Sequence, residues 1–199
     1  DLDLTTDGTI TASIDTTEDV DELKTLTGTD HAYTIVIADG DATSTTAAEL
    51  TTINGKTTEA IDASAITALA SDTIDNIKTL LTAGNDEEQF TDASFGSLTE
   101  VTVSDQTLDG SDLAGAIDEA NTATDDTSVV FDISAANTIE GSEENFTALL
   151  TDDGNGQIDI DAQDITVTGE ISVDNANLLD AATDGTITAS IDTTEDVDE

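Results

Sequence analysis

The same 17 residues occur twice in this chain, at 6–22 and again at 183–199, as TDGTITASIDTTEDVDE. The two copies lie 177 positions apart, and Leu2 and Asp3 match Leu179 and Asp180 at the same offset. Secondary-structure patterning does not place an identical segment at such a distance, whereas a tandem array does. We therefore expect 1–182 to form one repeat unit of about seven coils and 183–199 to begin the next copy.

Strand-type and helix-type runs alternate along the chain. Runs rich in Thr, Ile and Val, such as 33–37 and 129–133, precede stretches with Leu or Ile at helical spacing, and a Gly often closes the unit. Successive strand runs lie roughly 24 to 30 residues apart, a length typical of one strand and one crossover helix joining parallel strands.

This pattern predicts an α/β fold, a parallel strand–helix solenoid (β-solenoid-like) repeated in tandem every 177 residues. The alternative is an all-β right-handed parallel β-helix. The residues expected in the solenoid core are Ile35, Ile37, Ile61, Val130 and Ile133.

The charge of the chain is strongly one-sided. It holds 46 acidic residues, three lysines and no arginine, for a net charge of −43. Nucleic acid is thereby excluded as a direct partner, because phosphate binding needs basic residues, and an anionic membrane surface is disfavoured. With no apolar run long enough to span a bilayer, membrane insertion is not expected. The expected partners are further copies of the chain and divalent cations.

Composition also limits the core and the cross-links. The chain has no Cys, so neither disulfides nor zinc–thiolate sites are expected. Five aromatic residues, four Phe and one Tyr, predict a core that is mainly aliphatic.

One segment has the composition of a calcium loop. Ca²⁺ binds six to eight oxygens on a flexible loop, and acidic or amide side chains alternate here with glycines. The candidate ligands are Asp152, Asp153, Asn155, Asp159 and Asp161. The alternative is a Gly-rich turn after a helix, with Asp159 and Asp161 on the solvent face of a strand. No cofactor is required by the sequence, and Ca²⁺ is a candidate ligand.

Two further chemical possibilities were weighed. Asn145-Phe146-Thr147 matches an N-glycosylation sequon, so Asn145 is a candidate glycosylation site, with Phe146 expected in the core. Any pairing of carboxylates among 46 acids is expected by chance, and no platform of aromatic residues for a sugar is evident. We therefore expect no catalytic residues and no enzyme activity.

Several phrases resemble known surface proteins. The stretches 47–58 (AAELTTINGKTT), 61–67 (IDASAIT) and 101–105 (VTVSD) resemble the Thr/Ala/Asp-rich repeats of giant surface proteins of marine cyanobacteria and related phage fibres. That resemblance implies an exported structural or adhesive role.

A second resemblance links 112–121 (DLAGAIDEAN) and 129–133 (VVFDI) to the cap and first coil of secreted right-handed parallel β-helix proteins. Those proteins usually carry a basic residue where Ala114 stands here. Both resemblances imply parallel solenoids, and neither transfers a catalytic residue.

The sequence thus predicts a structural repeat unit of an extracellular filament, fibre or surface layer, assembled by end-to-end stacking of coils. The alternative is the spacer stalk of a large adhesin or phage fibre. Either role places the chain outside the cell or at its surface, as in a marine bacterium.

Overall fold

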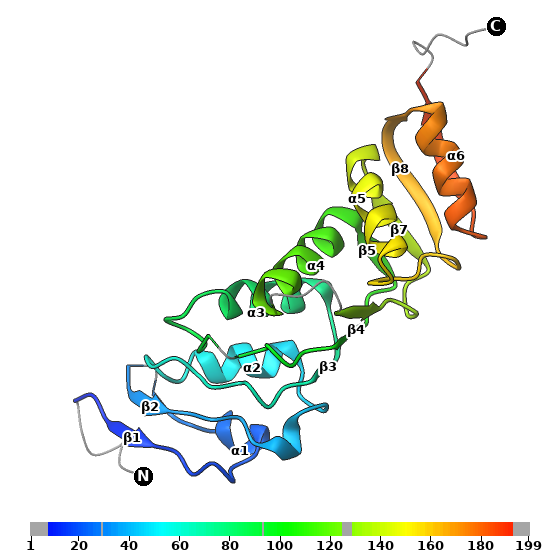
Figure 1. Ribbon diagram of the computed structural model, residues 1–199. Helices are drawn as coiled ribbons and strands as arrows, with labels where there is room; N and C mark the ends of the chain where they lie inside the picture. Colours follow the sequence, from blue (N-terminus) through cyan, green and yellow to red (C-terminus); the bar gives the residue numbers. More distant parts are fainter. Residues whose placement is uncertain (1–7, 29, 93, 125–128, 193–199) are drawn as a thin grey trace, which may run out of the picture.

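A computed structural model describes residues 8–28, 30–92, 94–124 and 129–192 (Figure 1). The elements, in chain order, are β1 (Thr11–Ser13), α1 (Val20–Leu23), β2 (Ala32–Thr34), the 3₁₀ turn η2 (Asp39–Asp41), α2 (Ala47–Asn54), β3 (Ala68–Asp72), α3 (Ile74–Gly84), β4 (Glu100–Val103), β5 (Thr107–Asp109), α4 (Gly110–Thr124), β6 (Val130–Asp132), β7 (Thr138–Gly141), α5 (Glu143–Gly154), β8 (Asp164–Ile171), α6 (Val173–Ala182) and β9 (Ile187–Ile191).

The paired strands all run parallel, in three separate sheets. The sheet orders are β1-β2, β3-β4-β6 and β5-β7-β8-β9. A solenoid or β-helix would add each coil's strand to one continuous ladder. In the described parts of the chain, three short parallel sheets and six α-helices instead make a mixed α/β fold in a single domain. The predicted strand–helix solenoid is therefore wrong, and so is the alternative right-handed parallel β-helix.

The ladder breaks because consecutive strands enter different sheets. β4 and β6 belong to the three-stranded sheet, whereas β5 and β7, which follow them after short bends, belong to the four-stranded sheet. The three-stranded sheet ends at β6, since the strand-type run at 158–160 is a loop. The β3–β4 and β8–β9 pairs also shift register part-way along. An even spacing of strand-type runs does not reveal such changes of sheet.

The helices pack in chain order, each against the next, from α1 to α6. Two of the three lysines bridge such neighbours. Lys24, the C-cap of α1, lies 2.5 Å from Glu49 of α2, and Lys78 of α3 lies 2.8 Å from Asp112 of α4. These ion pairs join successive helices in a chain with few positive charges.

Three carboxylates also tie successive segments together. Each accepts a hydrogen bond from a backbone N–H in the first turn of the helix before it, where negative charge is favoured. The pairs are Asp41 with Val20 N in α1 (3.3 Å), Asp72 with Ala48 N in α2 (2.7 Å) and Asp105 with Ile74 N in α3 (2.7 Å). Some of the acidic residues thus stabilise the contacts between successive segments of the fold.

The core agrees with the sequence at four of the five expected positions. Ile35, Ile37, Ile61 and Ile133 are at most 2% exposed, but Val130 is 43% exposed. Val130 lies on the edge strand β6, and Phe131 beside it is the residue that enters the core. All four Phe residues are buried, Phe146 among them as expected. The core is therefore mainly aliphatic and also contains every Phe ring of the chain.

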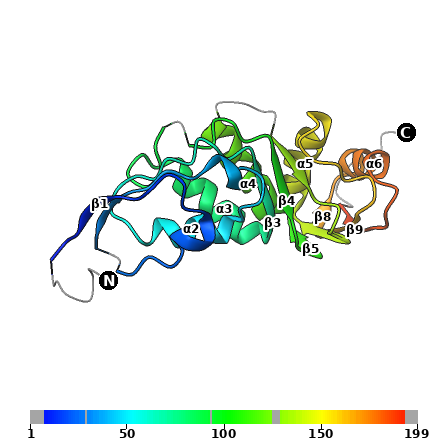
Figure 2. The same cartoon turned by 90° about the horizontal axis from the view of Figure 1, so that it is seen from below.

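The chain advances from one end of the molecule to the other (Figures 1 and 2). β1 and α1 lie at one end, and α6 and β9 lie at the opposite end. Within the described ranges, no helix is both long and apolar enough to cross a membrane. The described parts of the repeated sequence, 8–22 and 183–192, thus lie at the two ends of an elongated domain.

Candidate functional site

The predicted calcium ligands are split between a helix and a loop. Asp152 and Asp153 belong to the last turn of α5, and Asn155 is its C-cap. Asp159 and Asp161 lie in the loop that follows and are exposed. Consecutive helical side chains point about 100° apart, because an α-helix has 3.6 residues per turn. Asp152 and Asp153 therefore do not face a common point.

The surroundings of these two carboxyls also differ. Burial raises the pKa of the Asp152 carboxyl to about 6, and the charge of Asp118 on α4 adds to the effect. Burial also raises the pKa of Asp153, with Asp159 and Asp161 contributing through like-charge repulsion. The like charge that acts on Asp152 thus comes from α4, and the like charges that act on Asp153 come from the loop.

The loop carboxylates are engaged by backbone groups. Asp153 Oδ1 accepts from Ile160 N at 3.3 Å, and Asp159 Oδ1 accepts from Asp161 N at 3.0 Å. Across the described parts of the chain, no group of three or more His, Cys, Asp or Glu side chains is arranged to hold a metal ion. Ca²⁺ binding by these five residues stays a prediction.

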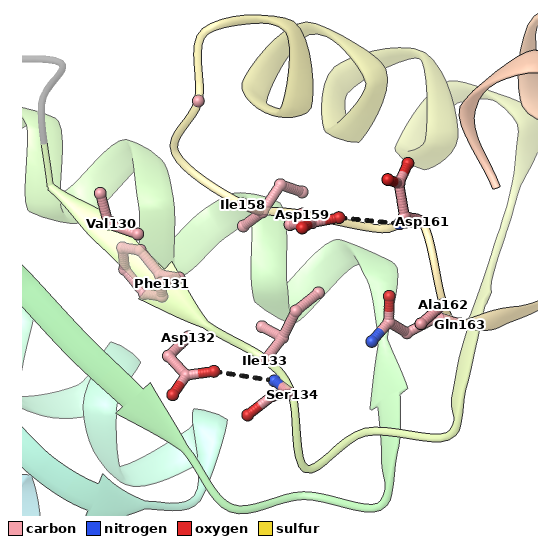
Figure 3. A pocket seen from close by; sticks show the side chains of 11 residues that line it. Val130, Phe131, Asp132, Ile133, Ser134, Ile158, Asp159, Asp161, Ala162 and Gln163 are labelled. Atoms are coloured by element: carbon pink, nitrogen blue, oxygen red, sulfur yellow. Dashed lines mark hydrogen bonds between the residues drawn. The ribbon is translucent and has the colours of Figure 1, made fainter.

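A hollow of about 430 Å³ lies between β6 and the segment 156–163 (Figure 3). Residues 158–160 of that segment form a loop and not a strand. Phe131 N donates to Gln157 O at 2.7 Å, but the chain then turns away from β6. On the β6 side, Ser134 N donates to Asp132 Oδ1 at 3.0 Å, and hydrogen bonds from the side chain and the backbone of Ser134 lower the pKa of Asp132. The hollow thus lies along an edge of β6 that is joined to Gln157 but, within the described residues, pairs with no further strand.

The sequon asparagine lies in the first turn of α5. Asn145 Oδ1 accepts from Ser142 N at 2.9 Å and from Ser142 Oγ at 2.8 Å, which completes a capping box. The side chain is half-buried, and its Cβ lies against Gly141. Glycosylation of Asn145 stays a prediction, at a residue that also caps a helix.

The repeated sequence forms the terminal strand at both ends of the fold. With the offset of 177, Thr11–Ser13 of β1 correspond to 188–190, which lie within β9. β1 pairs with the strand after it, β2, whereas β9 pairs with the strand before it, β8. The same sequence is thus an opening strand at one end and a closing strand at the other.

The two copies use opposite edges of this strand. In the N-terminal copy, Ile10 O accepts from Ala32 N at 2.9 Å and Ile14 N donates to Thr34 O at 3.0 Å. In the C-terminal copy, Thr186 O accepts from Ile165 N and Asp192 N donates to Ile171 O, both at 2.9 Å. Thr186 and Asp192 correspond to Thr9 and Asp15, the neighbours of Ile10 and Ile14 in sequence.

Because backbone groups alternate between the two sides of a strand, positions 10, 12 and 14 face the following strand and positions 186, 188, 190 and 192 face the preceding one. No backbone group is needed for both pairings.

The entry to β9 is fixed closely to the preceding segment. Thr183 Oγ1 donates to Gln163 O at 2.8 Å, and Asp184 N donates to Asp161 O at 2.7 Å. Gly185 passes so close to the chain that an added Cβ would lie 2.1 Å from Gln163 O. Only glycine fits there, so the glycine of the repeat has a packing function.

Apolar side chains are exposed at the β9 end, and a hollow is present at the β1 end. Val173 and Leu178 of α6 and Ile191 of β9 are 42%, 55% and 44% exposed. The hollow at the other end has a volume of about 400 Å³, and its apolar lining residues are Ile14, Leu23 and Leu26. One end thus projects apolar groups, and the other end has a recess lined by these three apolar residues together with polar ones, Asp15, Glu18 and Glu22 among them.

No family model matches this chain, no curated protein matches its sequence, and no solved structure matches its fold. The resemblances to surface repeats and to secreted β-helix proteins therefore stay predictions. Sequence reasoning identified the repeated segment but missed that its two copies pair through opposite edges. The alternation of Ile10, Ala12 and Ile14 with Thr and Ser marks a strand with one apolar face, but it carries no signal for which backbone edge is paired.

Proposed function

We propose that this chain is the structural repeat unit of an extracellular filament, fibre or surface layer. The single observation that carries the proposal is that one sequence forms the terminal strand at each end of an elongated domain. Copies joined end to end through these terminal strands would form an array that extends along one direction, with the same fold in every copy. Localisation outside the cell rests on the resemblance to surface repeats.

The acidic surface fits such a role. A net charge of −43 keeps neighbouring filaments apart in solution, because like charges repel over about a Debye length. Divalent cations reduce this repulsion as counter-ions spread over the surface. Ca²⁺ in this proposal acts on the whole surface and is not a required cofactor.

The second candidate is the spacer stalk of a large adhesin or phage fibre. The same elongated unit supports it, since a spacer also needs distant ends. The two roles differ in what lies at the tip: a stalk projects singly and holds a distinct binding domain away from the surface.

Immunogold labelling of whole source cells with antibodies against the chain tests the proposal. We expect gold particles at regular intervals along surface filaments or across a surface layer. Single projections with a knob at the tip would favour the stalk. Label confined to the cell interior would contradict both roles. Cells treated with preimmune serum serve as the control.

A further inference from the structure

We infer that consecutive copies share one strand: β9 of one copy is at the same time β1 of the next. This inference rests on the proposed tandem array and states how its units are joined. The occupant of the outer edge of β9 is the segment Ala32–Thr34 of a second copy of this chain.

The first argument is the backbone. Among the described residues, β9 has no strand on its outer edge, where the backbone groups of Ile187, Ala189 and Ile191 lie. The corresponding residues Ile10, Ala12 and Ile14 face β2 in the N-terminal copy. A second copy placed with its β1 on β9 keeps the β8 pairing and brings β2 to the free edge.

The second argument is a specific side-chain acceptor. Ile10 N donates to His31 Nδ1 at 3.1 Å, just before β1 and β2 begin to pair. His31 is 7% exposed and packs edge-on against Tyr33, with ring centroids 5.3 Å apart. At the joint, Ile187 takes the place of Ile10, so its N–H donates to His31 of the second copy.

The third argument is the apolar surface. Helices pack in chain order, so the next helix after α6 is α1 of the second copy. Leu178 and Ile191 are exposed at one end. The recess at the other end is lined by Leu23 and Leu26, by the acidic residues Asp15, Glu18 and Glu22, and by Ile14, whose place Ile191 takes at the joint. In the joined pair both surfaces meet at the same boundary, where water is removed from apolar groups on each side.

The test uses a two-copy chain in which residue 199 is followed directly by residue 23 of the second copy. Amide exchange is measured by NMR at 187–191 in this chain and in the single chain. We expect the amides of Ile187, Ala189 and Ile191 to exchange at least about tenfold more slowly when the second copy is present. The amides of Thr188 and Ser190, which face β8, are expected to be protected in both chains.

Matched proline variants separate the two edges. Ala189→Pro removes an N–H from the outer edge only, so the single chain should keep its Tm and its β8 pairing, because proline is tolerated on the free side of an edge strand. In the two-copy chain the same change should abolish the added protection at Ile187 and Ile191. Ser190→Pro removes an N–H that faces β8 and should lower Tm in both chains.

Ala12→Pro gives the converse result within the single chain. Its N–H faces β2, so this substitution should break the β1–β2 pair although the local sequence equals that around Ala189. If the amides of Ile187, Ala189 and Ile191 exchange equally fast in both chains while the second copy is folded, the shared strand is refuted. The filament role is then still decided by the labelling pattern on cells.

Discussion

Replacement of Asp152 by Asn should stabilise the protein at neutral pH. Burial raises the pKa of this carboxyl from its ordinary value of 3.8 to about 6, and Asp118 adds a like charge nearby. A pKa difference of about two corresponds to roughly 3 kcal/mol. The side chain is only half-buried, so solvent screening reduces the expected gain to about 1–2 kcal/mol.

The sign follows from linkage. Because the folded-state pKa is the higher one, ionisation of Asp152 costs stability fully above about pH 6 and not at all below its unfolded value of 3.8. The advantage of Asp152→Asn should therefore be complete at pH 7, decline as the pH falls from about 6 to 4, and vanish at lower pH.

Urea unfolding of both proteins at a series of pH values, followed by circular dichroism, measures this difference. Asp159→Asn is the matched control, since that carboxylate is exposed and the amide oxygen can still accept from Asp161 N. We expect the control to change the free energy of unfolding by less than about 0.5 kcal/mol. Equal stability of Asp152→Asn and the parent at pH 7 would refute the reasoning. A loss of stability in the variant only when Ca²⁺ is present would identify Asp152 as a ligand.

Three further outcomes are expected. Val130→Asp should cost less than about 1 kcal/mol because Val130 is 43% exposed, whereas Phe131→Ala should cost about 3–5 kcal/mol, and thermal unfolding of the two variants compares them. Gly185→Ala should cost about 1–3 kcal/mol and release the amides of β9 to exchange, since its Cβ meets Gln163 O, while Gly154→Ala, with nothing within 4 Å, should be neutral or slightly stabilising. Titration with CaCl₂ should raise Tm gradually without saturating at one ion per chain, and calorimetry showing one tight site would contradict a diffuse counter-ion role.

The alternation of apolar residues gave the element types but not their arrangement. Strand-type runs at 129–133 and 165–167 and helical spacing around Leu113 and Ile117 correspond to β6, β8 and α4. Parallel pairing also follows from the long crossovers. The predicted solenoid was wrong because bends such as 104–106 decide which sheet a strand joins. Hydrophobic periodicity does not indicate the geometry of such a bend.

Burial along a strand shows the same limit. In the run 129–133, Val130 reads as a core residue by composition, yet the alternation of side chains turns Val129, Phe131 and Ile133 inward and Val130 outward. The charged Asp132 lies on the same face of the strand as Val130, so the alternation in this run marks the outward face, whereas apolar composition alone does not.

The candidate calcium ligands are divided between a helix and a loop for a related reason. Oxygen ligands at alternate positions suit an extended loop, but α5 continues to Gly154 and takes Asp152 and Asp153 into its last turn. Helical rotation then separates their carboxylates, and backbone N–H groups take up Asp153 and Asp159. Residues that are close in sequence therefore present their carboxylates in different directions.

The sequence alone determined that one segment occurs twice, that the chain is strongly acidic, and which runs are strands or helices. Those properties depend on residue identity and on local periodicity. Only the tertiary structure decided that the repeated segment closes the sheet at one end and opens another at the far end. Which edge of a strand is paired depends on the neighbours that the fold brings beside it, and the residues of the strand itself are the same in both places.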